Sequence, residues 1–212
     1  MSTVNETRAL AVEFVDAIAI IRIDQPQRRN ALSLATLTEL NSIFSEITAA
    51  SGLCAIVFTG TGDAFASGAD IRELATLNSQ SARSFAERGQ KLFQRIAESR
   101  QRTFAAINGY CMGGGLDLAL ACDVRVASPD AVFSHPGAQL GIITGWGGTQ
   151  RLPRLIGKGR AFELFMTARR FSAQEALEIG LVTSIFDPVL DYALKLARNL
   201  KKETADCSAI SS

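Results

Sequence analysis

Three consecutive glycines, Gly113 to Gly115, stand directly before a run of good helix formers, and an acid, Asp117, follows two residues later. The first N–H groups of a helix have no partner inside it, and the helix dipole favours negative charge there. Glycine has no Cβ atom, so a ligand can approach this backbone closely. The segment predicts a site for a negatively charged oxygen. The alternative is a tight strand-to-helix turn packed against a neighbour.

A second loop of small residues, "FASGADIREL" (65–74), also lies between a predicted strand and a predicted helix. Two such loops could bring two backbone N–H donors to one point, which is the geometry that holds an oxyanion. Taken alone, this loop would be an ordinary surface loop.

Nucleotide-phosphate loops are the main competing explanation for so many glycines. The chain contains no G-x-x-x-x-G-K-[ST] pattern, and neither the triple glycine nor "GWGGTQ" (145–150) completes G-x-G-x-x-G. With 22 Lys and Arg against 21 Asp and Glu, the net charge is only +1. This balance predicts neither nucleic acid nor an anionic membrane as a partner, so an anionic ligand requires a local basic cluster.

The residues that usually bind metals are scarce. There is one histidine, His135, and the four cysteines (Cys54, Cys111, Cys122 and Cys207) form no C-x-x-C pair. We therefore expect no metal site and reduced cysteines, most of them in the core. The N-terminal residues do not resemble a signal peptide, and no apolar run reaches the ~20 residues of a membrane span, so we expect a cytoplasmic protein.

The elements that must position these loops alternate between strand and helix along the 212 residues. This alternation predicts one α/β domain with largely parallel strands. Apolar stripes predict helices over 33–50, with Ser33 as N-cap, over about 82–96, 114–122 and 189–201, and in two stretches within 149–180. Strands are expected at 9–13, 17–23, 54–60, 103–109, 123–128 and 181–186, and a loop at 61–70.

Five ordered segments carry a family resemblance: "QPQRRNALS", "FASGADIREL", "AAINGYCMGGGLDLALACDVRVAS", "LGIITGWGGTQRLPRLIG" and "ARRFSAQEALEIGLV". Together they resemble the crotonase family, also called the enoyl-CoA hydratase/isomerase superfamily, from about residue 10 to residue 190. The resemblance implies a spiral of ββα units and a site for acyl-CoA thioesters. It implies a coenzyme A thioester as substrate and no permanently bound cofactor.

The same resemblance assigns roles residue by residue. The N–H groups of Ala69 and Gly114, with Gly113 beside them, correspond to the family's oxyanion hole for the thioester enolate. The binding segment for coenzyme A corresponds to Ser67, Gly68, Ala69, Asp70 and Ile71. Arg28 and Arg72, and less directly Arg29, lie where the family places basic residues near the phosphates; the alternative is solvated surface arginine.

The catalytic pattern departs from the family's two glutamates. The first position is Asp117, and the second, in "FSHPGAQLG" (133–141), is Gly137, which has no titratable group. Asp117 could move one proton alone, His135 could reach the site, or a water or small anion could fill the space. The alternatives are an acid that complements the helix dipole and a structural histidine. Trp146 is a candidate for the acyl pocket or for packing.

The chain also ends earlier than the family pattern, so we expect a shortened C-terminal helical region. The expected organisation is a crotonase-like domain over 1–200 and a polar, disordered tail over 201–212, in a homotrimer or dimer of trimers. We predict an acyl-CoA-processing enzyme of the hydratase/isomerase type, with hydration in question because of Gly137. The alternatives are a catalytically silent acyl-CoA binder or an isomerase, decarboxylase or thioesterase with a single carboxylate.

Overall fold

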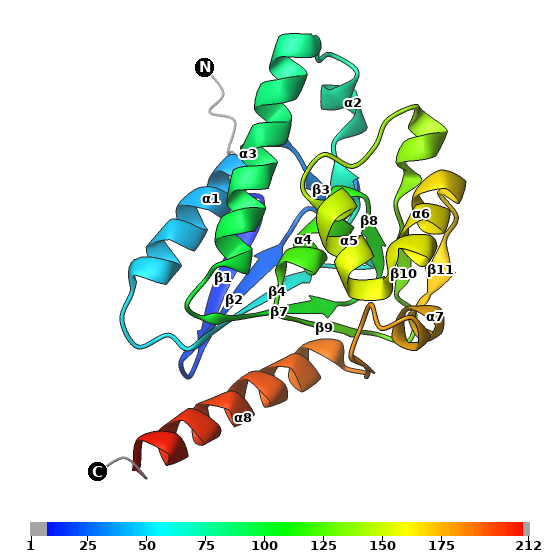
Figure 1. Cartoon of the computed structure of the whole chain (residues 1–212). Helices are drawn as coiled ribbons and strands as arrows, with labels where there is room; N and C mark the ends of the chain where they lie inside the picture. The colour runs from blue at the N-terminus through cyan, green and yellow to red at the C-terminus, as the bar shows by residue number, and fades with distance from the viewer. Residues whose placement is uncertain (1–7, 210–212) are drawn as a thin grey trace, which may run out of the picture.

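The computed structural model describes the backbone of residues 8–209 and the side chains up to residue 199. A six-stranded sheet crosses the molecule in the order β1-β2-β4-β7-β9-β12 (Figure 1). Its strands are β1 (Leu10–Val15), β2 (Ile18–Ile23), β4 (Ala55–Gly60), β7 (Arg102–Ile107), β9 (Val124–Ala127) and β12 (Ser184–Ile185). The hairpin β1–β2 is antiparallel and every other pair in this sheet is parallel.

A second, smaller sheet lies beside the first. Its four strands neighbour one another in chain order, as β4, β7, β9 and β12 do in the large sheet. It contains β5 (Ala64–Ala66), β8 (Tyr110–Met112), β10 (Val132–Ser134) and β11 (Phe171–Ser172) in the order β11-β10-β8-β5. Strands β4, β7 and β9 of the large sheet each continue into β5, β8 and β10 of the small sheet, and a helix follows each pair. This is the predicted spiral of ββα units.

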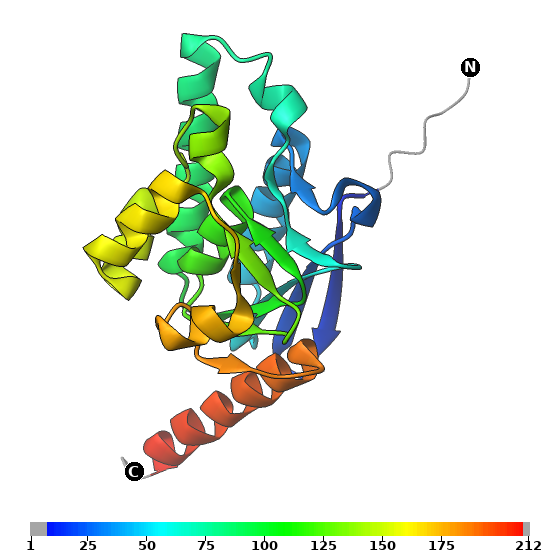
Figure 2. The same ribbon diagram turned by 90° about the vertical axis from the view of Figure 1, so that its right-hand side faces the viewer.

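Eight α-helices pack against the sheets, and α4 among them is buried. They are α1 (Leu34–Ala49), α2 (Ile71–Leu74), α3 (Ser79–Ala97), α4 (Gly114–Ala121), α5 (Gly148–Ile156), α6 (Lys158–Thr167), α7 (Ala173–Glu178) and α8 (Val189–Ala209) within residues 8–209. Helices α1 and α3 lie on one side of the large sheet and α8 on the other (Figures 1 and 2). In β2, Ala19 and Ile21 join the core under α1 and α3, whereas Ile18 and Ile20 join the core under α8. Both faces are buried, as a largely parallel sheet requires.

Local sequence signals fix the helix starts that matter for the site. Ser33 caps α1 as predicted, because its Oγ accepts a hydrogen bond of 3.1 Å from the Thr36 N–H. Asn78 caps α3 in a reciprocal capping box with Ser81. Asp70 caps the short α2 by accepting a hydrogen bond from the Arg72 N–H, which fixes where the loop ends and the helix begins.

Three expectations about secondary structure were wrong in detail. The loop expected at 61–70 contains β5 and a second short strand, β6 (Gly68–Ala69), which pairs in parallel with β3 (Ala31–Leu32). The two helical stretches within 149–180 are three helices separated by Gly157 and β11, because glycines and a tertiary strand pairing interrupt the apolar stripe. The strand expected at 181–186 is only β12, because the N–H groups of Leu181 and Val182 donate to the Ala176 carbonyl of α7 and not to a neighbouring strand.

The C-terminal helix is longer than predicted. Helix α8 continues to Ala209, beyond the expected end near residue 201, whereas residues 210–212 lie outside the described part of the chain. The division into a domain and a disordered tail stays a prediction. Cys54, Cys111 and Cys122 carry free thiols, the last two buried. No helix within residues 8–209 is both long and apolar enough to cross a membrane.

Candidate active site

The two small-residue loops meet, as predicted, at the start of helix α4. A Cβ atom built on Gly68 would lie 2.8 Å from the backbone nitrogen of Gly114, and one built on Gly114 would lie 3.4 Å from that of Ala69. The pairing of β6 with β3 holds Ala69 at this point. Gly114 is the first residue of α4, so its N–H has no acceptor inside its own helix. Two backbone donors therefore lie side by side.

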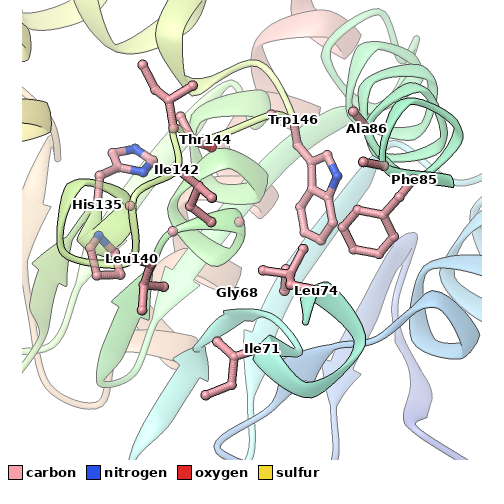
Figure 3. Close-up of a pocket in the computed structure, with 18 of the residues that line it drawn as sticks. Gly68, Ile71, Leu74, Phe85, Ala86, His135, Leu140, Ile142, Thr144 and Trp146 are labelled. Atoms are coloured by element: carbon pink, nitrogen blue, oxygen red, sulfur yellow. The ribbon is translucent and has the colours of Figure 1, made fainter. Parts of the chain in front are cut away.

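Both donors border a cavity of about 240 Å³ (Figure 3). Its wall is mainly apolar and comes from the loop after β5, helix α3, the start of α4 and the glycine-rich loop before α5. The lining residues include Ser67, Gly68, Ala69, Ile71, Leu74, Phe85, Ala86, Gly113, Gly114, His135, Gly137, Leu140, Ile142, Ile143, Thr144 and Trp146. Of the predicted binding segment 67–71, every residue except Asp70 lines this cavity. Asp117 does not line it.

Asp117 lies behind the cavity wall and is fully buried. Its Oδ2 accepts hydrogen bonds from the Thr144 hydroxyl and, at 3.2 Å, from the Trp146 N–H. Its Oδ1 has no hydrogen-bond partner among the described residues. Asp117 lies in the first turn of α4, where an acid complements the helix dipole, and the loop before α5 also holds it through Thr144 and Trp146.

His135 connects that carboxyl with the cavity. Its Nε2 lies 3.7 Å from the Asp117 Oδ1, the residue is part of the cavity lining, and its ring centroid lies 5.0 Å from that of Phe165. The imidazole is buried, and within residues 8–209 neither ring nitrogen has a hydrogen-bond partner. A water or small anion in this space, the third expectation from the sequence, stays a prediction.

Burial shifts the pKa values of Asp117 and His135 so that the uncharged form of each side chain is favoured. It raises the pKa of the Asp117 carboxyl from 3.8 to about 7, against the opposing hydrogen bonds from Thr144 and Trp146. It lowers the pKa of the His135 imidazole from 6.5 to about 4. Burial thus favours a neutral imidazole and makes the Asp117 carboxyl a much weaker acid than a solvated aspartate, as a group that exchanges a proton near neutral pH requires.

Gly137, at the position of the missing glutamate, lines the same cavity. A Cβ atom built there would lie 2.6 Å from the carbonyl oxygen of Ile142, whose N–H donates a hydrogen bond of 3.0 Å to the Gly137 carbonyl. The glycine-rich loop therefore occupies the space that a side chain at 137 would need. The position is adapted to glycine and does not simply lack an acid.

A second hollow of about 650 Å³ lies on the other side of the binding segment. Arg28, Arg29, Asp70 and Arg72 line it together with Ser67 and Ala69. The guanidinium of Arg72 pairs with Asp70 at 3.1 Å, which lowers the pKa of that carboxyl, and Arg29 lies 5.2 Å from the ring centre of Tyr110. The fold thus brings together the local basic cluster that the neutral net charge required.

Two residues of the site were missed in the sequence. Thr144 donates to Asp117, and a Cβ atom on Gly148 would lie 2.1 Å from the Asp117 Oδ1 and 3.1 Å from the His135 Cε1. A glycine is therefore required at 148 to leave room for the pair. The glycine-rich segment was visible in the sequence, but nothing there indicated which of its glycines faces an acid.

Comparisons with known proteins agree with this geometry. The family model "Enoyl-CoA hydratase/isomerase" matches residues 13–211. The chain belongs to the enoyl-CoA hydratase/isomerase family, within the crotonase superfamily. It is 40% identical over 198 residues to a short-chain-enoyl-CoA hydratase of Clostridium acetobutylicum, covering 92% of this chain and 76% of the relative. It is 39% identical to a crotonyl-CoA hydratase of Syntrophomonas wolfei, covering 84% and 69%.

Solved structures of enoyl-CoA hydratases have the same fold as this chain. A crystal structure of an enoyl-CoA hydratase from Bacillus anthracis matches with a TM-score of 0.88 at 38% identity, covering 92% of this chain and 77% of that one. An enoyl-CoA hydratase from Thermoplasma volcanium matches with a TM-score of 0.89 at 36% identity, covering 93% and 79%. No group of three or more metal-binding side chains occurs in the described part of this family member.

Proposed function

We propose that this family member acts on acyl-CoA thioesters by proton transfer at the α-carbon, through an enolate held by the N–H groups of Ala69 and Gly114. The observation that carries the proposal is the meeting of these two donors at the wall of an apolar cavity. Negative charge gathers on the thioester oxygen as the α C–H bond breaks, and donors fixed beforehand stabilise that charge. One such donor contributes roughly 3 to 4 kcal/mol in comparable oxyanion holes.

The proton travels through His135 and Asp117. Both ring nitrogens of His135 are buried, so the ring must turn to bring Nδ1 to the cavity; Nδ1 then takes the α-proton, and the Nε2 proton passes to the Asp117 Oδ1. One C–H bond and one N–H bond break, one N–H bond and one O–H bond form, and the electron pair moves into the enolate. The separation of 3.7 Å is longer than a hydrogen bond, so the transfer requires a small closure or a bridging water.

This arrangement favours reactions that remove a proton and return it, such as shifting a double bond. Hydration also requires a group that activates water, and Gly137 supplies none. The relatives named above are short-chain-enoyl-CoA and crotonyl-CoA hydratases, so acyl-CoA esters are the substrate class to test. The coenzyme A phosphates would meet Arg28 and Arg72 in the second hollow.

The test measures deuterium uptake at the α-carbon of butyryl-CoA in D₂O by mass spectrometry. Turnover of crotonyl-CoA and of a 3-enoyl-CoA is followed alongside it. We expect exchange and double-bond shift by the wild-type protein, and at least a roughly 100-fold loss in Asp117→Asn and His135→Gln, since a general acid/base group contributes typically 10²–10⁴-fold. Asp130→Asn, at an exposed turn, is the matched control and should exchange at the wild-type rate.

Three outcomes separate the alternatives. Tight binding of butyryl-CoA without exchange or turnover would make the protein a catalytically silent acyl-CoA binder. Exchange that survives in both variants would remove the proton path but leave the two-donor site. Binding of no coenzyme A ester would end the whole proposal. The trimeric assembly expected from the family is tested by light scattering; the cytoplasmic location stays a prediction.

A further inference from the structure

Trp146 forms a wall between the acyl cavity and a separate hollow of about 820 Å³. It lines both spaces, together with Thr144 and Gly145 of the same loop. The far hollow lies between α3 and α5 and is lined by polar and cationic side chains, namely Gln90, Lys91, Gln94, Arg95, Gln150, Arg151 and Arg154. The two spaces therefore differ in chemistry as well as in size.

The indole is held firmly in this position. Cβ atoms built on Gly89 and Gly114 would each lie 2.3 Å from its ring atoms. Gly89 is in close contact with the five-membered ring of the indole and Gly114 with the six-membered ring. Its ring centre lies 5.2 Å from that of Phe85 and 5.6 Å from that of Phe93, and the residue is only 3% exposed. Figure 3 shows the indole beside Phe85 and Ala86 of α3.

We propose that Trp146 sets the acyl-chain length by closing the cavity next to Gly114, which confines the enzyme to short acyl groups. This inference rests on the proposed function, since it takes the ligand to be an acyl-CoA ester. A Cβ atom built on Gly114 would lie 2.3 Å from the indole, so a thioester held at this residue has the indole beside it. The cavity of about 240 Å³ is also smaller than the 300–1,000 Å³ of most small-molecule pockets. The indole lies between this cavity and the far hollow, so a longer chain that extends in this direction meets its ring first.

Trp146→Ala removes the wall and keeps its backbone N–H, which donates to Asp117. Binding of the saturated esters butyryl-CoA and decanoyl-CoA is measured by calorimetry, which does not depend on catalysis. We expect the wild type to prefer butyryl-CoA and the variant to shift the preference toward decanoyl-CoA by at least about tenfold, because the added methylenes become buried in the space that the indole leaves beside Phe85 and Phe93. Trp146→Phe, with a smaller ring that keeps part of the wall, should give an intermediate shift even if the alanine variant folds poorly.

Phe162→Ala is the matched control. Phe162 is an aromatic residue of α6 that is 66% exposed and lines neither the cavity nor the far hollow. Its removal should leave the chain-length preference unchanged. Trp146 is the single tryptophan of the chain, so its fluorescence should also change when butyryl-CoA binds to the wild type.

The outcomes distinguish this inference from the function beneath it. If the wild type binds butyryl-CoA and decanoyl-CoA equally, or if neither substitution of Trp146 changes their ratio, the role of the indole is wrong and the proposed function stands. If the wild type binds neither ester, both proposals fail together. A shift in Phe162→Ala as large as that in Trp146→Ala would also show that the indole does not set the chain length.

Discussion

Replacing Asp117 with Asn should reveal a pH dependence of stability that the wild-type protein conceals. The folded state raises the pKa of Asp117 from 3.8 to about 7, so between these values it holds a proton that the unfolded chain releases. The contribution of Asp117 to the free energy of unfolding therefore falls by about 1.4 kcal/mol for each unit of rising pH. It reaches its lowest level above about pH 7.

His135 contributes with the opposite sign. Its pKa falls from 6.5 to about 4 on folding, so between these values the unfolded chain holds the extra proton. Its contribution rises by about 1.4 kcal/mol for each unit of rising pH and is complete above pH 6.5. Between about pH 4 and pH 6.5 the two contributions cancel in the wild type.

Single substitutions remove one contribution at a time. Relative to the wild type, Asp117→Asn should gain about 3 to 4 kcal/mol of stability between pH 4 and pH 6.5, from the product of 2.5 pH units and 1.4 kcal/mol. His135→Gln should lose a similar amount over the same range, and the double variant should follow the wild type. Asn keeps the shape of Asp117 and can still accept from Thr144 and Trp146.

The assay is urea denaturation at several pH values within this range, analysed as the difference from wild type at each pH. Carboxyl groups whose pKa is lowered by arginines, such as Asp70 and Glu163, are common to all variants and drop out of the difference. Asp130→Asn controls for the loss of one acid. Curves for Asp117→Asn and His135→Gln that run parallel to the wild-type curve would refute the burial argument for both groups.

Three further predictions concern the glycine-rich loop and the basic hollow. Gly137→Glu should lower the melting temperature and fail to introduce crotonyl-CoA hydration, since its Cβ would meet the Ile142 carbonyl; a hydratase gained without loss of stability would contradict this. Gly148→Ala should destabilise by about 1–3 kcal/mol in urea because it collides with Asp117, whereas Gly159→Ala, which meets nothing in α6, should not. Arg28→Ala should weaken coenzyme A binding in calorimetry roughly fivefold at low salt and less at high salt; equal loss at both would argue against phosphate contact.

Much of the fold could be predicted because its signals are local. Apolar periodicity marked α1, α3 and the buried strands, and Ser33 was a cap within its own turn. The expected loop at 61–70 was wrong because β6 has only two residues and exists through its pairing with β3, a partner far away in the sequence. Short strands of this kind carry little periodic signal, and tertiary pairing decides them.

The candidate site was also predicted in part from the sequence and in part decided by the structure. The residue types and order of the sequence were enough to indicate the family, the two N–H donors at Ala69 and Gly114, and the departure at Gly137. Distances were not available from it. Only the tertiary structure decided that Asp117 lies behind the wall with His135 in front of it, because burial and a 3.7 Å separation depend on how α4 packs against the loop before α5.

The role of Trp146 also depended on the tertiary structure. From the sequence it was equally a pocket residue and a packing residue, since a tryptophan beside glycines serves either purpose. In the folded chain it does both, because the bare backbones of Gly89 and Gly114 let the indole pack between α3 and α4 while it faces the cavity. Which residues are present was settled by the sequence; which of them share a space depends on contacts between segments far apart in the chain.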